Sequence, residues 1–458
     1  MHHVGDKIPE SAVSSLDQLP LSRFHWRLLL VSGIGWLFDA MDVLVVGSVV
    51  AAVSREWGLD ATQAQWINTA NLAGLFFGAL ASGILADRLG RRLVFAATLL
   101  LYSIFSGLSA AATGVGMLMA LRFLAGLGLG GELPVAATLV SEFMPAKRRG
   151  FMVVLLESFW AYGSVAAALI AFLVIPTWGW RVALLLGALP AFYAFVIRRA
   201  LPESPRYLAS KGRYAEAEAI VRRIAAEGGV ALAPRTPAAA QAVAPPPQAG
   251  VSQLFSPLYR RRTLVLWVMW ATMNFSYYGI FLWLPLQFTR RGFSLEQALL
   301  FNLIIAIAQI PGYFSAAYLV ERVGRKPTFV AYLLLAAVGA FFFGQEALTA
   351  RDIPAILIWG SVVSFFNLGA WGVVYTYTPE LYPTTLRGTG SGWAAACGRI
   401  FAFLAPLSIA YQIAVFRSDR TVFLVFTIVM VLGGLIVWLF GPETRGRSLD
   451  ALTPTVDA

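Results

Sequence analysis

Residues 83–92 read Gly-Ile-Leu-Ala-Asp-Arg-Leu-Gly-Arg-Arg, and residues 317–326 read Ala-Tyr-Leu-Val-Glu-Arg-Val-Gly-Arg-Lys. Both stretches hold an acidic residue, an arginine, a glycine and two basic residues at the same spacing, and each follows a long apolar run. They lie 234 positions apart. A motif that recurs at such a distance predicts two copies of one structural unit.

Two further pairs of motifs recur with almost the same displacement. Ser141-Glu142-x-x-Pro145-x-x-x-Arg149-Gly150 recurs 238 positions later as Pro379-Glu380-x-x-Pro383-x-x-x-Arg387-Gly388. Pro202-Glu203-Ser204 recurs 240 positions later as Pro442-Glu443-Thr444. Three matched pairs at nearly constant spacing are difficult to obtain by chance, so the sequence predicts an internal duplication.

The composition places most of the chain in a lipid bilayer. Hydrophobic residues make up 58% of the 458 residues and charged residues only 13%, with a mean hydropathy of +0.71. Soluble domains carry about 25% charged residues. Twelve apolar stretches are long enough to cross roughly 30 Å of hydrocarbon as helices. They lie at about 27–52, 66–86, 93–112, 115–141, 151–175, 180–199, 263–289, 296–320, 327–345, 353–379, 389–414 and 421–441.

We therefore predict an all-α membrane protein with twelve transmembrane helices in two pseudo-symmetric six-helix bundles. The expected bundles are residues 27–199 and 263–441, between a cytoplasmic segment, 1–26, and a cytoplasmic tail, 442–458. Residues 200–262 form a linker, with an amphipathic helix expected over 203–224 and a disordered Ala/Pro-rich stretch over 231–250. No cleavable signal peptide is expected, because the polar segment 1–26 leads into a full-length span.

The basic residues predict the orientation of the spans. The net charge is +11. Of the 35 lysines and arginines, 26 lie in the terminal segments, the even loops and the linker. The odd loops hold seven: Arg55, Arg181, Arg290, Arg291, Arg351, Arg417 and Arg420. Since basic loops stay inside, both termini are expected in the cytoplasm. The excess of positive charge is thus a topology signal and argues against a nucleic-acid partner.

Other function classes find little support. The single cysteine, Cys397, excludes an intrachain disulfide framework and a multi-cysteine metal site. The three histidines precede the first apolar run, so proton coupling would have to use carboxylates. We find no catalytic cysteine motif, metal-ligand cluster or phosphate-binding loop, so neither an enzyme nor a cofactor or metal is expected. The glycines of residues 126–131 follow small-x-small spacing, which predicts close helix packing.

Six ionisable residues lie inside the predicted spans, where each costs at least a few kcal/mol and is a functional candidate. Asp39 and Asp42 share one helix face and, at low dielectric, resist being ionised together. Arg122 could pair with one of them, a contact worth roughly 4 kcal/mol before desolvation. The alternative is a static ion pair between spans 1 and 4. The proton-coupling candidates are Asp39, Asp42, Arg122, Glu132 and Glu157.

Substrate-binding candidates follow from Arg399 and the aromatic residues. A guanidinium in mid-span needs an anion, and span 11 has no acidic residue, so its partner lies on another helix or on the substrate. Aromatic faces stack flat rings and attract cations, although aromatic side chains also fill bundle cores. The candidates are Arg399, Glu157, Trp160, Asn274, Tyr277, Tyr278, Trp371, Tyr375 and Trp393. An aromatic cleft with one arginine suits a planar aromatic carboxylate.

The repeated loop motifs predict a conformational switch. Gly83 would let span 2 approach a neighbour, and Asp87 could accept from open N–H groups at another helix end. Arginines of the motif could bridge carboxylates across the seam between the halves and bias the outward/inward equilibrium. The alternative is that they only fix topology. The switch candidates are Gly83, Asp87, Arg88, Arg91, Arg92, Glu142, Arg149, Glu321, Arg325, Glu380 and Arg387.

Together these motifs resemble the major facilitator superfamily, in its sugar-porter-like branch. The resemblance implies two halves that rock around a midplane site. It also implies that Asp42 and Arg122 form a proton-linked pair, and that Glu157 stands where sugar porters carry a sugar-binding glutamine. The glutamine pair that sugar porters place in span 7 is missing from residues 267–278. The residues therefore argue against a sugar substrate.

Three further runs resemble the bacterial niacin-transporter group, which is related to aromatic-acid:proton symporters: residues 38–43, 126–136 and 155–161. This resemblance implies proton-coupled import of nicotinate or a related small aromatic carboxylate through a monomer in the bacterial inner membrane, with nicotinamide as a further candidate substrate. The partners would be the small-molecule substrate, protons and the lipid bilayer. An aromatic-acid symporter, an organic-cation carrier and a non-transporting receptor stay open as alternatives.

Overall fold

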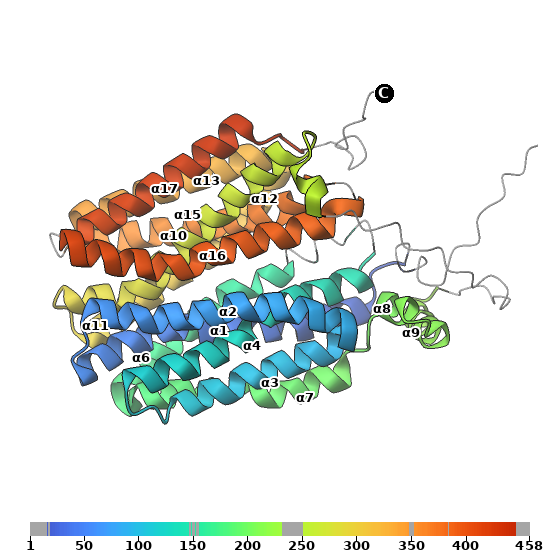
Figure 1. Cartoon of the computed structure of the whole chain (residues 1–458), viewed down its shortest axis with the longest axis horizontal. Coiled ribbons are helices and arrows are strands. Elements are labelled where there is room, and N and C mark those ends of the chain that lie inside the picture. Colours follow the sequence, from blue (N-terminus) through green and yellow to red (C-terminus); the bar gives the residue numbers. More distant parts are fainter. Residues whose placement is uncertain are drawn as a thin grey trace, which may run out of the picture.

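The computed structural model describes residues 16, 19–145, 148, 152, 155–230, 251–347, 352–382 and 384–445, and the described part is built of helices (Figure 1). The long helices of the first half are α1 (Arg23–Trp57), α2 (Ala61–Leu89), α3 (Arg91–Ser109), α4 (Val115–Phe143), α6 (Phe159–Leu186) and α7 (Pro190–Ala200). Those of the second half are α10 (Arg260–Arg290), α11 (Leu295–Ile307), α12 (Gln309–Arg322), α13 (Arg325–Phe342), α15 (Ile353–Glu380), α16 (Thr384–Phe416) and α17 (Asp419–Phe440).

The predicted twelve-helix fold is confirmed in the described part of the chain. Ten stretches are long and apolar enough to cross a membrane, and one of them, Leu155–Ala200, holds two crossings. These two crossings meet at Gly179, whose φ of 80° interrupts the helix after Pro176. The 29-residue helix α2 supplies the remaining crossing. Crossing eight is divided into α11 and α12.

The two halves repeat the same helix pairing, as the duplication predicts. In the first half α2 and α3 pack on α4, α1 packs on α6, and α3 packs on α7. In the second half α12 and α13 pack on α15, α10 packs on α16, and α13 packs on α17. The halves meet through α1 with α10, α2 with α16, and α6 with α11. The interface between the halves therefore has the same pseudo-two-fold symmetry as the sequence motifs.

Glycines let α2 and α4 approach one another. A Cβ added at Gly130 of α4 would collide with the carbonyl oxygen of Leu75, and one added at Gly78 of α2 would collide with that of Leu127. The predicted close packing at the glycines of α4 is therefore confirmed. Small residues are what membrane helices need at such a contact, because only they allow backbones to touch.

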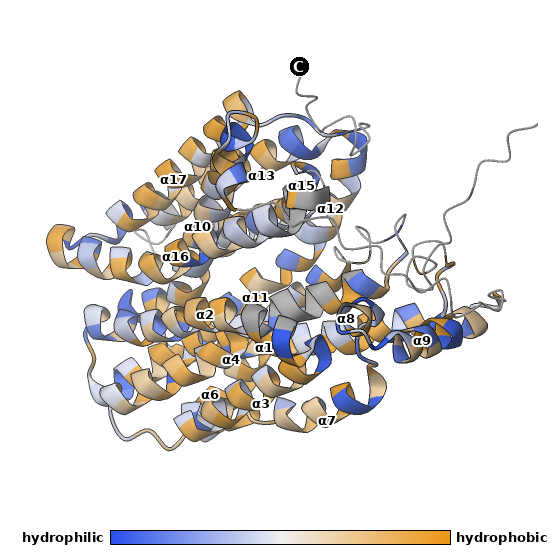
Figure 2. Ribbon diagram, turned by 45° about the vertical axis from the view of Figure 1, so that its right-hand side comes forward, coloured by the Kyte–Doolittle hydropathy of each residue, from blue (hydrophilic) through white to orange (hydrophobic). Residues whose placement is uncertain are grey.

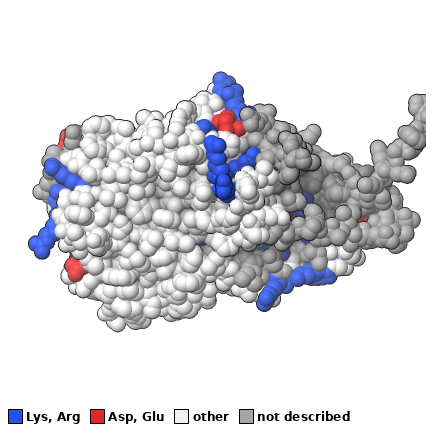
Figure 3. Space-filling view, turned by 45° about the horizontal axis from the view of Figure 1, so that its top comes forward, with Lys and Arg blue, Asp and Glu red and all other residues white. Residues whose placement is uncertain are grey.

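Many residues of the bundle helices are apolar (Figure 2), and the outer surface of the bundles carries many of them, as lipid contact requires. Large hydrophobic side chains such as Phe192, Leu439 and Tyr411 are exposed on it. Most of the described surface visible in Figure 3, drawn in white, carries no charged side chain.

Two short helices of the linker, α8 (Pro205–Ser210) and α9 (Tyr214–Glu227), lie at one end of the molecule (Figure 1). Helix α9 buries one face, with Val221 and Ile224, as an amphipathic helix does. The predicted disordered stretch 231–250 lies outside the described residues.

Candidate functional site

A buried ion pair joins α1 and α4 inside the first half. Arg122 Nη1 lies 3.2 Å from Asp42 Oδ2, and the side chains of the two residues are 1% and 0% exposed. Two serines of α3 complete the group. Ser106 Oγ accepts from Arg122 Nη2 at 2.8 Å and donates to Asp42 Oδ1, while Ser109 Oγ accepts from Arg122 Nε at 3.1 Å. The structure therefore brings the candidate pair together, and the Arg122 guanidinium links α4 to side chains of α1 and α3.

A second group of acidic side chains lies one helix turn away. Asp39 of α1 and Glu132 of α4 are both buried. Glu132, Asp42 and the Tyr102 hydroxyl are electrostatic neighbours of Asp39. The carboxyls of Asp39 and Glu132 lie within hydrogen-bonding reach of one another, and the Tyr102 hydroxyl lies within reach of Asp39. Two buried carboxyls this close are expensive to ionise together, so this group is suited to holding protons.

Aromatic rings from both halves gather around the seam between α6 and α10. Trp160 packs on Trp36 at 4.8 Å between ring centroids, and its Nε1 donates to Tyr277 Oη at 2.6 Å. Tyr278 stands edge-on to Trp160 at 6.3 Å. Since α1 and α6 belong to the first half and α10 to the second, these contacts join the halves.

The second half extends the aromatic group. Trp371 stacks on Tyr375 at 5.6 Å with an interplanar angle of 27°, and Trp270 stands edge-on to both. Tyr277 is 6.4 Å from Trp371. The rings therefore form one continuous apolar and aromatic wall.

Two charged candidates, Arg399 and Glu157, border this wall. Both are electrostatic neighbours of Tyr375, and Arg399 is also a neighbour of Tyr278. Arg399 is partly buried, and its Nη1 donates to the Gly130 carbonyl of α4 at 3.2 Å. No carboxylate of the described residues forms an ion pair with it. We expected the anionic partner of Arg399 to lie either on another helix or on the substrate. The described part of the chain supplies no Asp or Glu as that partner.

Asn274 and Trp393 play different parts from the other candidates. Asn274 Nδ2 donates to the Trp270 carbonyl at 2.8 Å and lies against Gly398, next to Arg399. Trp393 stacks on Trp267 at 6.4 Å and is 44% exposed. None of its ring contacts involves the aromatic wall. The structure therefore does not bring Trp393 into the group of substrate-binding candidates.

The switch candidates form one charge network in each half. Arg91 lies 3.6 Å from Glu142 in the first half, and Arg325 lies 3.1 Å from Glu380 and 3.2 Å from Glu321 in the second. Burial raises the pKa of the Glu142 carboxyl, and the Arg91 guanidinium acts in the opposite direction.

The ion pairs just described each lie within one half. Each arginine begins a helix whose first turn lies beside a glutamate of its own half. Bridges from the motif arginines to carboxylates across the seam between the halves stay a prediction.

Other switch candidates contribute backbone contacts or fall outside the description. The Arg88 carbonyl accepts from Tyr207 Oη, and Arg92 Nη1 donates to the Leu201 carbonyl. Arg149 and the side chains of Gly83, Asp87 and Arg387 lie outside the described residues.

Two residues that sequence reasoning did not select hold these networks together. Glu203 accepts from the backbone N–H groups of Arg91 and Arg92, the first residues of α3, at 3.0 Å and 3.3 Å. Glu443 accepts in the same way from Arg325 and Lys326, the first residues of α13, both at 3.1 Å. A carboxylate at a helix N-terminus satisfies open donors and faces the positive end of the helix dipole. The repeated Pro-Glu pair was the signal that could have identified both.

The comparisons with known proteins agree with this architecture. Residues 31–455 match the family described as Sugar (and other) transporter. The chain belongs to this family. It is therefore a membrane transporter of the major facilitator type and not an enzyme. As a member of this family it moves a small molecule by secondary transport, and it crosses the membrane several times.

Three similar proteins stand out among the matches. The niacin transporter NiaP of Acinetobacter baylyi is 44% identical over 440 residues, which cover 96% of this chain and 99% of the relative. A putative niacin/nicotinamide transporter NiaP of Bacillus subtilis is 44% identical over 433 residues, covering 94% and 99%. The xylose transporter XylE from E. coli, in a partially occluded inward-open conformation, superposes with a TM-score of 0.75 at 20% identity, covering 93% and 100%. That structure supports the fold alone.

Sequence reasoning on this transporter also missed several polar partners inside the spans. Ser106, Ser109 and Tyr102 are ordinary-looking residues of α3, and only the fold brings them to Asp42 and Asp39. Trp36 was missed as well, and only the fold brings its indole N–H to the Glu157 carboxyl. For Ser106 and Ser109, the available sequence signal was a polar residue within an otherwise apolar predicted span.

Proposed function

We propose that the chain imports nicotinate, or a related small aromatic carboxylate, together with protons across the bacterial inner membrane. It acts by alternating access, as a monomer with both termini in the cytoplasm. The observation that carries the proposal is Arg399, a guanidinium in mid-span beside an aromatic wall with no carboxylate of the described chain paired to it. The two relatives named for niacin support the choice of substrate.

The substrate-binding step follows from the residues around Arg399. The guanidinium pairs with the substrate carboxylate, preferably through two hydrogen bonds. The flat ring stacks against the wall formed by Trp371 and Tyr375. The Trp36 indole N–H lies beside the Glu157 carboxyl and orients it. A protonated Glu157 carboxyl donates to the pyridine nitrogen, which distinguishes nicotinate from benzoate.

Proton coupling uses the two acidic groups of the first half. Protonation of Asp42 removes the negative charge that holds Arg122. The guanidinium then keeps only the hydroxyl oxygens of Ser106 and Ser109, and the contact between α1 and α4 weakens. Asp39 and Glu132 provide a neighbouring place for the proton. Coupling arises because the two protonation states favour different arrangements of these helices.

Glu157 favours a second candidate function, the transport of an organic cation. A carboxylate among aromatic faces is the usual environment of a bound cation. Arg399 opposes this alternative, because it lies beside the same Tyr375 ring and repels a positive ligand.

A thermal-shift panel on the purified protein tests the proposal. Nicotinate and 4-hydroxybenzoate carry a carboxylate, nicotinamide is the neutral counterpart of nicotinate, and choline is a cation. We expect nicotinate to stabilise the wild type most strongly, and Arg399→Ala to lose more of the carboxylate response than of the nicotinamide response. Stabilisation by choline alone would refute the proposal. Equal losses for acid and amide would show that Arg399 is structural.

Uptake into liposomes then separates a carrier from a receptor. Purified protein in liposomes should accumulate labelled nicotinate when the outside is acidic. Accumulation that is insensitive to the pH gradient would remove proton coupling from the proposal. Binding without any accumulation would indicate a receptor.

A further inference from the structure

A cavity of about 320 Å³ lies at the end of the second half that faces away from α8 and α9. Its lining consists of Arg290, Arg291, Arg417, Ser418, Asp419 and Arg420. The first two end α10, and the others lie where α16 gives way to α17. Four arginines and one aspartate give the lining a formal charge of +3 at neutral pH. Four of the seven basic residues of the odd loops are therefore gathered in one place.

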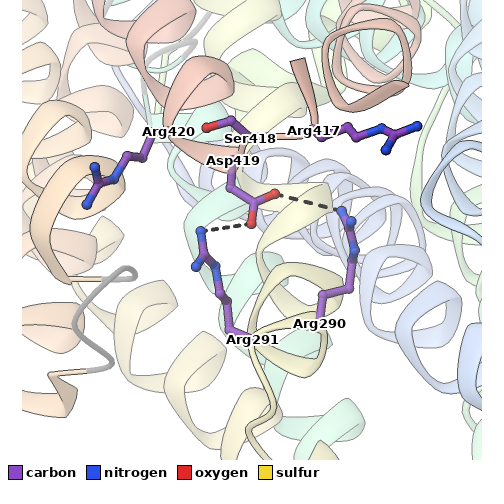
Figure 4. A pocket seen from close by; sticks show the side chains of 6 residues that line it. All are labelled: Arg290, Arg291, Arg417, Ser418, Asp419 and Arg420. Carbon is purple, nitrogen blue, oxygen red and sulfur yellow. Dashed lines mark ion pairs between the residues drawn. The ribbon is translucent and has the colours of Figure 1, made fainter. Parts of the chain in front are cut away.

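The single carboxylate of the lining is shared by two arginines. Asp419 lies 2.9 Å from Arg291 Nη2 and 3.8 Å from Arg290 Nη1. In Figure 4 these two guanidinium groups converge on Asp419, whereas Arg417 and Arg420 extend to opposite sides of it. The Nε of Arg291 is buried and has no acceptor among the described residues. Arg417 forms no ion pair with a carboxylate of the described residues, so Asp419 leaves this guanidinium of the lining available to an anion.

The backbone adds to the positive field. Helix α17 begins at Asp419, and the side chain of its N-cap Ser418 does not cap the first turn. The positive end of the helix dipole and open N–H groups therefore point toward the cavity. Arg417 has a φ of 51°, the one positive value found at a residue other than glycine in the described chain. Glycine would adopt this left-handed conformation at lower cost, so the arginine is held there against its backbone preference.

The location of these charges runs against the topology rule. Basic residues are disfavoured on the outer side of a membrane protein, because the positive-inside bias sets its orientation. A cluster of four on that side needs a reason other than orientation. Guanidinium groups bind carboxylates through paired hydrogen bonds. Helix α10 also carries Tyr277 and Tyr278, about 20 Å from Arg291 at 1.5 Å per residue, so the cavity lies at the outer end of a helix that lines the central site.

We propose that this cavity is an outer anion-binding site that captures the carboxylate substrate before it enters the central site. The proposal rests on the proposed function, because it takes the substrate to be an anion approaching from this side. Capture at a basic mouth raises the local concentration of an anion and speeds its association. It does not contribute to affinity at Arg399, and it does not act on a neutral substrate.

Arg417→Gly is the variant that tests the site with the least risk to folding. It removes one charge of the lining and relieves the left-handed backbone, so the helix ends are preserved. Arg417→Lys keeps the charge. Arg55→Gln is the matched control, since Arg55 is an exposed arginine on the last turn of α1, on the same side of the membrane but in the other half.

Uptake of nicotinate and of nicotinamide is measured in proteoliposomes at low and high salt. At low salt we expect Arg417→Gly to raise the KM for nicotinate by about threefold or more with kcat unchanged. The difference should fade at about 0.5 M salt, where the screening length is only a few ångströms. Arg417→Lys and Arg55→Gln should behave like the wild type, and nicotinamide uptake should not change.

Three results would overturn the site. An unchanged KM in Arg417→Gly would remove it, and equal effects of Arg417→Gly and Arg55→Gln would reduce it to net surface charge. An effect seen with phosphatidylglycerol but not with phosphatidylcholine liposomes would assign the cavity to a lipid phosphate. If the wild type takes up nicotinate normally, any of these three results refutes the outer site and leaves the proposed function standing. Absence of wild-type nicotinate uptake refutes the proposed function and, with it, the outer site.

Discussion

Replacing Asp42 by asparagine should leave Arg122 as an uncompensated cation inside the first bundle. Both side chains are almost fully buried, so water does not screen the charge. The guanidinium would keep Ser106 at 2.8 Å and Ser109 at 3.1 Å, which are neutral acceptors. Removing one partner of a buried ion pair costs about 3–5 kcal/mol. We expect Asp42→Asn to lower the apparent Tm in detergent by about 5 °C.

A double-mutant cycle separates the loss of the pair from general damage. Arg122→Gln alone should cost less, about 1–3 kcal/mol, because the glutamine amide can still donate a hydrogen bond toward Asp42. The double variant Asp42→Asn/Arg122→Gln should recover to within about 2 kcal/mol of the wild type, since two amides can bond to each other. Additive losses in the double variant would refute the argument that the stability lies in the charge pair.

Transport by the same variants tests the role of Asp42. Asp42→Asn should abolish uptake driven by a pH gradient but spare exchange of internal for external substrate, because only the driven reaction requires a proton to bind and leave. Unchanged pH-driven uptake in Asp42→Asn would contradict the role assigned to this carboxyl. Loss of both reactions would point to a structural role.

Gly130→Ala should destabilise the first half by about 1–3 kcal/mol, because the added methyl group collides with the Leu75 carbonyl. Gly116→Ala on the same helix meets open space and should be neutral or slightly stabilising. Thermal unfolding in detergent compares the two variants, and equal effects would exclude backbone contact as the cause. Glu203→Gln should lower the free energy of unfolding by about 1–2 kcal/mol because it removes the carboxylate at the start of α3, and an unchanged Tm would show that this cap does not stabilise the half. Trp371→Leu should weaken nicotinate binding about fivefold through the lost ring contact, while Trp393→Leu should leave the affinity unchanged. Titration calorimetry measures both affinities, and the reverse order would contradict the proposed location of the substrate.

The fold was predictable because it depends on features that sequence shows directly. Apolar length identifies spans, and a repeated motif identifies a duplication whatever the packing of the helices. The positions at which helices are interrupted were harder to predict from the sequence. Gly179 interrupts a helix between two crossings, and only its positive φ shows where one ends and the next begins.

The site was predictable in part, for a related physical reason. Charges such as Asp42, Arg122 and Arg399 stand out in an apolar sequence because burial makes them expensive. Aromatic residues do not stand out, because they are equally common in cores and at membrane surfaces. Trp371 and Trp393 have similar surroundings in the sequence, and what separates them is the helix face that each one occupies, since Trp371 is buried and Trp393 is exposed.

The two glutamates at the starts of α3 and α13 have a consequence for how the chain could be divided. Glu203 follows the last crossing of the first half and binds the third helix of that half, and Glu443 does the same in the second. Each half thus carries its own closing residue at its own end. Two separately synthesised polypeptides, divided after Gly229 in the linker, would each retain the contact that completes their bundle. A boundary drawn before Glu203, which precedes Gly229 by 26 residues, would leave the start of α3 without the carboxylate that caps it.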